Sequence, residues 1–304
     1  MATRVVPIRV GVAGWDYRDW KGPFYPARSP KGFDPLAYLA RYVDLIEINS
    51  TFYRPPEPEW TRRWRDRARR GAAAQFRFTV KLWQRFTHQR KEAWTREELR
   101  QFKDGIAPLK RSSMLSALLA QFPWSFRNSE ENREWLEDVQ RAFASYPLVV
   151  EVRHESWNVP EFYDWLTEQG IGFVNVDQPL FRKSIKPSAR STAHVGYVRV
   201  HGRNYRDWFR KAAGRDERYD YLYTPAELAP WVECTQAVAE EPGTEEVDVV
   251  FNNHYKAQAV VNALQFESML GREVHAPERL FETYAKELDA AGVQPERAPA
   301  EAAA

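Results

Sequence analysis

Short apolar runs rich in β-branched residues recur along this chain and alternate with longer amphipathic segments. The apolar runs cover residues 8–14, 44–50, 76–82, 115–122, 148–154, 172–177, 196–202 and 247–253. Runs of this length bounded by turn residues are typical of buried strands. The pattern therefore predicts eight strands.

The intervals between these runs mostly predict helices. The helical segments are residues 34–42, 58–70, 95–109, 129–146, 160–170, 224–241 and 256–270. Ser129 precedes two acids and is a predicted N-cap, whereas Gly170 is suited to the position after a helix C-terminus. The interval 178–194 has no helical pattern and is predicted to be a loop.

Eight strands that alternate with helices predict a parallel sheet, and eight is the number that closes a TIM-like (β/α)8 barrel. We find no internal repeat and no linker rich in Gly, Pro or Ser. We therefore expect one barrel domain over residues 1–292 and a disordered tail over 293–304, with an open doubly wound sheet as the alternative fold.

Alternation along the strands assigns side chains to faces. In "LVVEVRH", Val150 and Val152 share one face, and Val149, Glu151 and Arg153 share the other. In a barrel the uniformly apolar face should contact the helices. Glu151 and Arg153 are then expected to point into the barrel.

The same parity in other strands predicts a polar ring at their carboxyl ends. It holds three acids (Glu47, Glu151 and Asp177), three cations (Lys81, Arg153 and Arg199), and His201, Asn49 and Asn252. Catalytic groups lie at this end of TIM barrels, which favours an active site. The alternative is an ion-pair network that neutralises itself and fills the barrel, because buried charge must be paired.

Seven motifs in order resemble the YecE-like family, domain of unknown function 72. They are "GVAGWDYRDWKGPFYP", "IEINSTFYRPP", "FTVKLWQRFTH", "LLAQFPWSF", "EVRHESW", "YVRVHGRN" and "FNNHYKAQAVVNA", from about Gly11 to Ala263. The resemblance implies a TIM-like barrel and no established activity. Among matched positions outside the ring it includes Trp15, Tyr17, Tyr53, His88 and Trp157.

The ring is suited to acid–base chemistry on an anion. We expect Glu47, Glu151 and Asp177 to act as charged catalytic groups with His201 as an acid. Lys81, Arg153 and Arg199 would hold the anion, and Asn49 and Asn252 would contact substrate oxygens. Further predicted substrate contacts are His88 and the aromatic walls Trp15, Tyr17, Tyr53 and Trp157. Because the cations compete with a metal for the same carboxylates, we expect no metal and no cofactor.

These residues predict an enzyme of hydrolase or lyase type acting on a phosphorylated sugar or a nucleic-acid fragment. The alternative is a non-catalytic nucleic-acid or nucleotide-binding protein. The chain lacks GxSxG, GxxxxGK[ST] and GxGxxG patterns, which argues against a serine hydrolase, an NTPase and a dinucleotide enzyme.

Composition changes this picture little. Net charge is +2, but residues 60–91 hold eleven Lys or Arg and one acid; a solvated helix face is favoured over an anion-binding patch. The single cysteine, Cys234, permits no internal disulfide and favours a reducing compartment, the cytoplasm. No apolar run is long enough to cross a bilayer, and we expect no membrane partner.

Overall fold

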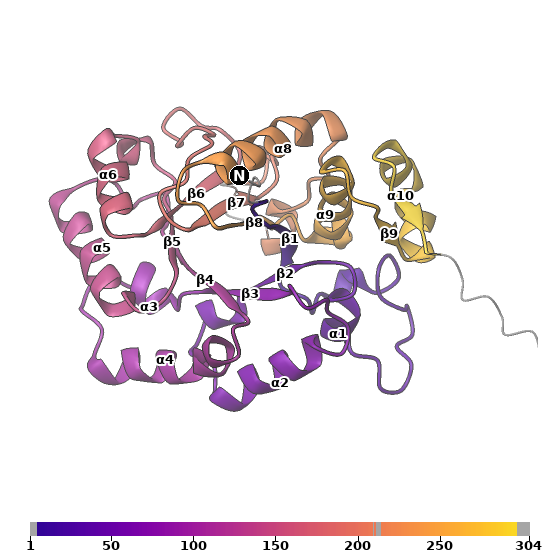
Figure 1. Cartoon of the computed structure of the whole chain (residues 1–304), viewed down its shortest axis with the longest axis horizontal. Helices are drawn as coiled ribbons and strands as arrows, with labels where there is room; N and C mark the ends of the chain where they lie inside the picture. The colour runs from indigo at the N-terminus through magenta and orange to yellow at the C-terminus, as the bar shows by residue number, and fades with distance from the viewer. Residues whose placement is uncertain (1–4, 209, 211–213, 297–304) are drawn as a thin grey trace, which may run out of the picture.

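Eight parallel strands close into a barrel in the computed structural model, which describes residues 5–208, 210 and 214–296 (Figure 1). Neighbours around the barrel follow chain order, and β8 pairs with β1. The strands are β1 (Ile8–Ala13), β2 (Leu45–Ile48), β3 (Arg77–Lys81), β4 (Leu115–Gln121), β5 (Leu148–Glu151), β6 (Gly172–Asp177), β7 (Val195–Val200) and β8 (Glu246–Phe251). The predicted TIM-like barrel is confirmed.

Helices cover the outside of the barrel (Figure 1). All seven predicted helices are present, as α1 (Pro35–Leu39), α2 (Pro58–Ala68), α4 (Arg96–Arg111), α5 (Glu130–Phe143), α6 (Pro160–Glu168), α8 (Pro225–Glu240) and α9 (Gln258–Met269). Further short elements are α3 (Gln84–Thr87), α7 (Arg215–Arg218), and the 3-10 turns η1 (Arg18–Trp20), η2 (Ser50–Phe52), η3 (Glu155–Trp157) and η4 (Tyr255–Ala257). Residues 178–194 contain no helix, as predicted.

Local signals in the sequence explain where several helices begin and end. The Ser129 side chain accepts a hydrogen bond from the backbone N–H of Asn132 and caps α5, as predicted. Thr95 and Glu98 form a capping box at the start of α4. Gly170 follows α6 with φ of 64°, a left-handed conformation that glycine adopts without steric cost.

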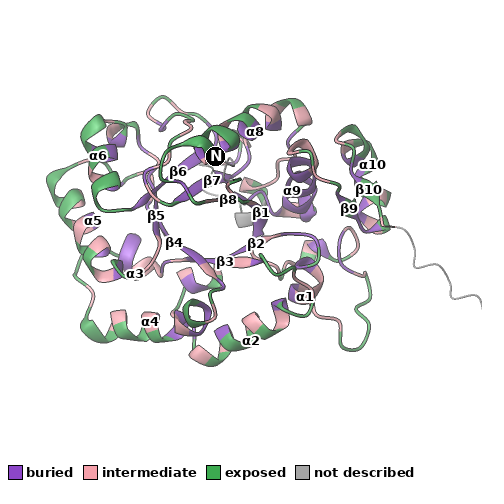
Figure 2. Cartoon of the chain, viewed as in Figure 1, coloured by how far each residue is buried: buried purple, intermediate pink, exposed green. Residues whose placement is uncertain are grey.

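Two apolar layers separate the outside of the barrel from its interior. Side chains such as Ile46, Val80, Val150 and Val198 pack in the large outer core with the helices. A smaller cluster holds Leu45, Ala117, Val149 and Tyr197 among others, and fills the barrel itself. In Figure 2 the strands are accordingly buried and the outer faces of the helices exposed. The predicted faces of β2, β3, β5 and β7 are confirmed.

The predicted orientation of β6 is wrong. Val174 and Val176 belong to the cluster inside the barrel, so Asn175 and Asp177 point outward. The Asn175 amide donates to the backbone carbonyls of Arg190 and Tyr197, and its oxygen accepts from Ser188 and Arg190. Most of these partners lie in the loop that replaces a helix after β6. They satisfy a buried polar group on the outer face, and strand alternation alone cannot reveal them.

The described part of the chain ends in a helix and two short strands that the sequence pattern did not predict. Helix α10 (Glu278–Ala290) packs beside α9, and strands β9 (His275–Ala276) and β10 (Gln294–Pro295) pair in parallel. The predicted tail starts at residue 293, but Val293 is buried; residues 297–304 of that tail lie outside the described residues. Among the described residues, no helix combines the length and the apolarity that a membrane span requires.

Candidate functional site

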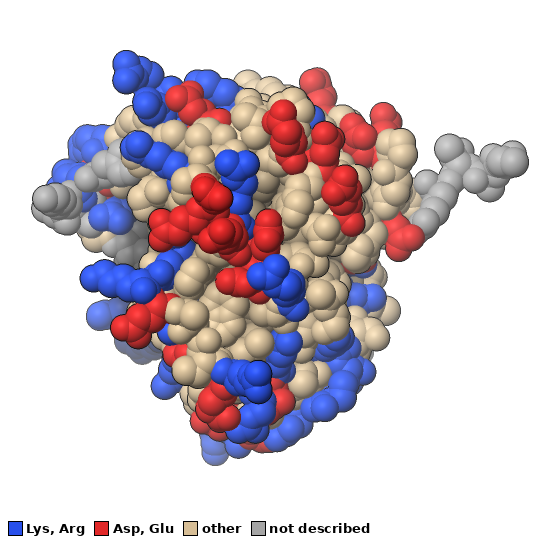
Figure 3. All heavy atoms as spheres, turned by 90° about the vertical axis from the view of Figure 1, so that its left-hand side faces the viewer, with Lys and Arg blue, Asp and Glu red and all other residues tan. Residues whose placement is uncertain are grey.

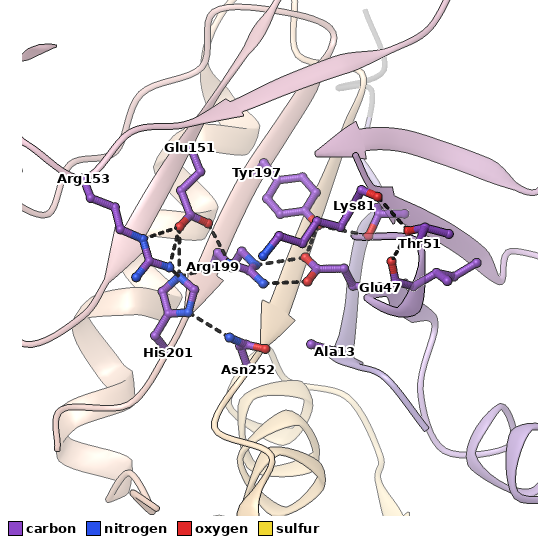
Figure 4. Close-up of polar contacts among 12 residues, drawn as sticks. Ala13, Glu47, Thr51, Lys81, Glu151, Arg153, Tyr197, Arg199, His201 and Asn252 are labelled. Atoms are coloured by element: carbon purple, nitrogen blue, oxygen red, sulfur yellow. Dashed lines mark hydrogen bonds and ion pairs between the residues drawn. The ribbon is translucent and has the colours of Figure 1, made fainter. Parts of the chain in front are cut away.

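An arginine on β7 and a glutamate on β2 form the centre of the polar cluster inside the barrel (Figure 4). Arg199 donates from Nε to Glu47 Oε2 at 2.9 Å and from Nη2 to Glu47 Oε1 at 2.6 Å. The Tyr197 hydroxyl donates to Glu47 Oε2 at 3.1 Å. Both charged side chains are almost completely buried, so this two-pronged geometry is what makes their burial tolerable.

Glu151 on β5 is shared between two arginines. Its Oε2 accepts from Arg199 Nη1 at 2.8 Å, and its Oε1 accepts from Arg153 Nε at 2.8 Å. Burial alone would raise the pKa of Glu151, but Arg153 and Arg199 outweigh it and hold this pKa well below its ordinary value. Glu151 is therefore ionised throughout the neutral range.

His201 lies against this pair and is neutral at pH 7. Its Nε2 is 3.3 Å from Glu151 Oε1 and 3.1 Å from Arg153 Nη2, and its Nδ1 is 3.0 Å from Asn252 Nδ2. Burial lowers the pKa of His201 to about 3, with Arg153 and Arg199 adding to the shift and Glu151 opposing it. At this pKa His201 is neutral at pH 7 and is a weak proton acceptor while Arg153 and Arg199 lie beside it; its role as an acid stays a prediction.

Lys81 at the end of β3 enters the same space without an anionic partner. Its Nζ is 4.4 Å from the centre of the Phe52 ring, and among the described residues no hydrogen bond or ion pair involves this nitrogen (Figure 4). Burial lowers the pKa of Lys81 to about 7; Arg199 adds to the shift, and Glu47 and Glu151 only partly offset it. We refer to Glu47, Lys81, Glu151, Arg153, Arg199 and His201 as the carboxyl-end cluster.

A pocket of about 260 Å³ opens above this cluster. Arg153 connects the two, since it binds Glu151 below and lines the pocket above with its guanidinium over the Trp208 ring. The lining is His88, Gln121, Pro123, Trp124, Arg153, Gln178, Ser184, Trp208, Arg218 and Tyr219. The pocket thus combines aromatic walls with cationic and amide side chains and, among these residues, has no carboxylate.

Several donors of the pocket lining have no protein partner. Gln178 Nε2 and Arg218 Nε are buried and, within the described part of the chain, make no hydrogen bond. Buried donors are normally paired, so unpaired ones gathered around one pocket indicate an acceptor-rich ligand.

His88 is one of the predicted substrate contacts, and it lies in the pocket wall. Its Nδ1 is 2.9 Å from the Thr87 hydroxyl, and its ring packs edge-on against Phe52 at 4.8 Å. Burial lowers the pKa of His88 to about 4, and Lys81 and Arg153 add to the shift. His88 is therefore a second neutral imidazole at the site.

Asp177 lies apart from the ring in which it was expected. Its carboxylate accepts from Arg203 Nε at 2.9 Å and from the Tyr223 hydroxyl. Burial raises the pKa of Asp177, although Arg203 and Tyr223 oppose the shift. The reversed face of β6 explains this placement, and it leaves the carboxyl-end cluster with one acid fewer than predicted.

The predicted aromatic walls do not gather at the pocket. Trp15 packs edge-on against Trp64, and Tyr17 stacks on His254 at 4.4 Å. Tyr53 is 60% exposed, and Trp157 is buried between Phe126 and Phe162, where it lines a separate cavity beside α5 and α6.

Asn252 contacts His201, as expected for two members of the predicted ring. Asn49 lies half-buried at the end of β2, and the Oδ1 of Asn49 has no partner among the described residues. The structure thus brings together the predicted charged residues other than Asp177, with Asn252 beside them, while the aromatic residues that line the pocket are ones the motifs did not predict.

The aromatic and cationic lining that the motifs missed comes from two loops. Trp208, Arg218 and Tyr219 lie in the polar, aromatic stretch 203–223, of which residues 209 and 211–213 lie outside the described residues. That stretch is suited in composition to a rim. Gln178 directly follows Asp177, and its position after a strand end was the available signal.

Two further predictions concern charge. Within the described residues no group of three or more His, Cys, Asp or Glu side chains could hold a metal ion. On α2, Arg62 and Arg63 pair with Glu59, and Arg67 and Arg70 pair with Asp34. Basic and acidic side chains are also interspersed on the face shown in Figure 3. These pairs favour a solvated helix face for the basic segment.

Comparison with known proteins gives consistent matches over nearly the whole chain. Residues 9–286 match the family described as "Protein of unknown function DUF72". The chain is similar to the UPF0759 protein YunF of Bacillus subtilis (strain 168), with 28% identity over 283 residues, 88% of this chain and 95% of that protein.

Two solved structures are also similar. A DUF72 family protein from Thermotoga maritima MSB8 is 36% identical with a TM-score of 0.73, over 88% of this chain and all of that one. A DUF72 family protein from Enterococcus faecalis V583 is 26% identical with a TM-score of 0.75, over 88% of this chain and 96% of that one. These matches confirm the family resemblance drawn from the seven motifs.

Proposed function

This chain belongs to the DUF72 family, and we propose that it is an enzyme of hydrolase or lyase type that acts on a small, polar, anionic substrate. A phosphorylated sugar or a nucleic-acid fragment has the required chemistry. The observation that carries the proposal is the pocket of about 260 Å³, in which buried donors of Gln178 and Arg218 have no partner among the residues that the structure describes. A phosphate or carboxylate group offers the acceptors that these donors lack.

Arg153 supports the link between substrate binding and chemistry. It is 12% exposed, it lines the pocket, and it covers both Glu151 Oε1 and His201 Nε2. An anion that draws the guanidinium toward the pocket would free Glu151 and His201 from it. In this proposal the withdrawal of that cation raises the pKa values of Glu151 and His201, and the pair then accepts a proton from the substrate.

The test is a panel of phosphorylated sugars and short oligonucleotides, followed by phosphorus NMR for turnover and by calorimetry for binding. Wild type should convert at least one compound. Glu151→Gln, checked for folding by circular dichroism, should still bind that compound and lose turnover. Arg69 caps the C-terminus of α2 and is not one of the residues that line the pocket. Loss of binding with Arg69→Gln would therefore contradict the proposed site.

The non-catalytic alternative gives a different result in the same experiment. A nucleic-acid binder should bind oligonucleotides with an affinity that falls steeply with salt and is unchanged in Glu151→Gln. Such binding without turnover of any panel member would replace the enzyme proposal.

A further inference from the structure

The carboxyl-end cluster is neutral without the charge of Lys81. Glu47 binds Arg199, and Glu151 binds both Arg199 and Arg153, so every oxygen of the two carboxylates already accepts from an arginine. Asp177, the third predicted acid, is paired with Arg203 elsewhere. A protonated Lys81, whose side chain is partly buried, would therefore add a positive charge that no carboxylate among the described residues pairs with.

Burial and two neighbouring cations, Arg199 and Arg153, favour the free amine of Lys81, and together they outweigh the opposing effect of Glu47 and Glu151. The contact of Nζ with the Phe52 ring would by itself favour the charged form. Burial lowers the pKa of Lys81 to about 7, so a large share of the side chain is uncharged at neutral pH. An uncharged lysine is a nucleophile, and desolvation beside another cation is a recognised way to activate one.

Lys81 also adjoins the pocket. Phe52 contacts both the Lys81 amine and the ring of His88, which lines the pocket. Lys81 pairs with Leu119 on β4, two residues before Gln121, and Gln121 pairs with Glu151 on β5. Gln121 and Arg153 both line the pocket. Lys81 is not itself a lining residue; its amine lies next to the pocket wall, in contact with the Phe52 ring that packs against His88.

We propose that Lys81 forms a Schiff base with a small carbonyl compound whose phosphate or carboxylate group is held by Arg153 and Arg218. The proposal rests on the proposed function, because those donors are the anion site. It narrows the reaction to a lyase type in which the substrate carries an aldehyde or ketone.

The covalent step balances without a further reactant. The lone pair of Lys81 Nζ bonds to the carbonyl carbon as the C=O π bond breaks, and one amine proton moves to the oxygen to give a carbinolamine. The second amine proton joins the hydroxyl, which leaves as water while the nitrogen lone pair forms the C=N bond; the two hydrogens of that water are thus the two hydrogens of the amine. The imine nitrogen then withdraws electrons from the neighbouring carbon, from which a base can remove a proton.

Reductive trapping tests the proposal. The full chain is incubated at pH 7 with glyceraldehyde 3-phosphate and sodium cyanoborohydride, and modified lysines are located by peptide mass spectrometry. Glyceraldehyde without phosphate is the matched probe. Lys103 is the matched control, because burial and nearby Lys110 lower its pKa too, yet it lies on α4 over Phe143 and away from the pocket.

We expect at least tenfold more modification at Lys81 than at Lys103, and at least tenfold less at Lys81 with unphosphorylated glyceraldehyde. Lys81→Arg and Lys81→Met should both remain folded by circular dichroism and lose this label. Equal labelling of Lys81 and Lys103, or labelling of Lys81 regardless of phosphate, would overturn the proposal.

Calorimetry with inorganic phosphate separates this proposal from the proposed function. Phosphate binding that Arg218→Gln weakens, together with an unlabelled Lys81, would reject the Schiff base and leave the anion site standing. Absence of phosphate binding would reject the anion site and the proposal with it.

Discussion

The two ends of this barrel each bury a cluster of charges, but among the described residues only the carboxyl end leaves a cation and N–H donors without partners. At the amino ends of the strands, Arg9 binds Glu246 at 2.8 Å and Asp248 at 3.4 Å, and donates from Nε to the Gln75 carbonyl. Ser116 donates to Asp248. We call Arg9, Ser116, Glu246 and Asp248 the amino-end cluster.

At the carboxyl ends the arginines also bind carboxylates. Within the described part of the chain, however, Lys81 has no such partner, and the adjoining pocket holds donors without acceptors. Both clusters are costly to bury, so burial and ion pairing by themselves do not mark a functional site. The difference lies in the charges and hydrogen-bond donors that remain once the ion pairs have formed. A structural cluster satisfies itself, whereas a site for an anionic ligand keeps positive charge and N–H groups for the ligand.

The largest expected effect comes from removing a shared carboxylate. Glu151→Gln leaves Arg153 without its carboxylate and Arg199 with only Glu47, so the free energy of unfolding should fall by about 3–5 kcal/mol. At the amino end, Glu246→Gln is the matched control; its side chain is 24% exposed and Arg9 keeps Asp248, so about 1 kcal/mol is expected. Urea denaturation measures both, and equal losses would remove the contrast between the ends.

The two ends should also respond to pH in opposite directions. Burial raises the pKa of Asp248 to about 6, so this group stabilises the fold fully below about pH 4 and loses that contribution as pH rises through 6. Two units correspond to on the order of 3 kcal/mol. Glu151 has a depressed pKa, so its contribution is present above about pH 4.3 and is lost as pH falls.

Urea denaturation between pH 4 and 7 checks this difference. Asp248→Asn should lack the loss of stability that wild type shows as pH rises, so the gap between the two proteins should change by on the order of 3 kcal/mol across this range. Parallel curves for the two proteins would show that Asp248 does not titrate there.

A smaller effect should fall on ligand binding alone. Arg218→Gln removes a charged donor from the pocket and should weaken phosphate binding about tenfold, equivalent to about 1.4 kcal/mol, with little change in melting temperature. Arg69→Gln on α2 removes the same charge from the basic helix and should leave the affinity unchanged. Calorimetry measures the phosphate affinity of both variants. A larger loss of affinity in Arg69→Gln than in Arg218→Gln would place the anion site on α2.

The smallest expected effect concerns the side chain between the two ends. The Tyr197 hydroxyl is 3.1 Å from Thr79 Oγ1 and donates to Glu47. Tyr197→Phe should lower the free energy of unfolding by about 1 kcal/mol without changing phosphate affinity. A large loss of affinity would mean that Tyr197 controls the position of Glu47 and Arg199 in the site.

Strand periodicity predicted the barrel and most of the ring because each signal is local. The alternation in "LVVEVRH" places Glu151 and Arg153 on one face wherever the strand lies. It failed on β6 because the partners of Asn175 come from residues 188–190, in a loop on the outer face that strand alternation cannot reveal. The pocket lining was missed for a related reason, since Trp208, Arg218 and Gln178 meet only after long loops fold over the barrel.

A crystal of the protein soaked in tungstate tests the central claim most directly, because anomalous scattering locates a tetrahedral oxyanion without ambiguity. We expect one strongly occupied tungstate site in the pocket, within hydrogen-bond distance of Arg153, Arg218 and Gln178. Tungstate bound only along the arginines of α2, with this pocket occupied by water alone, would contradict it.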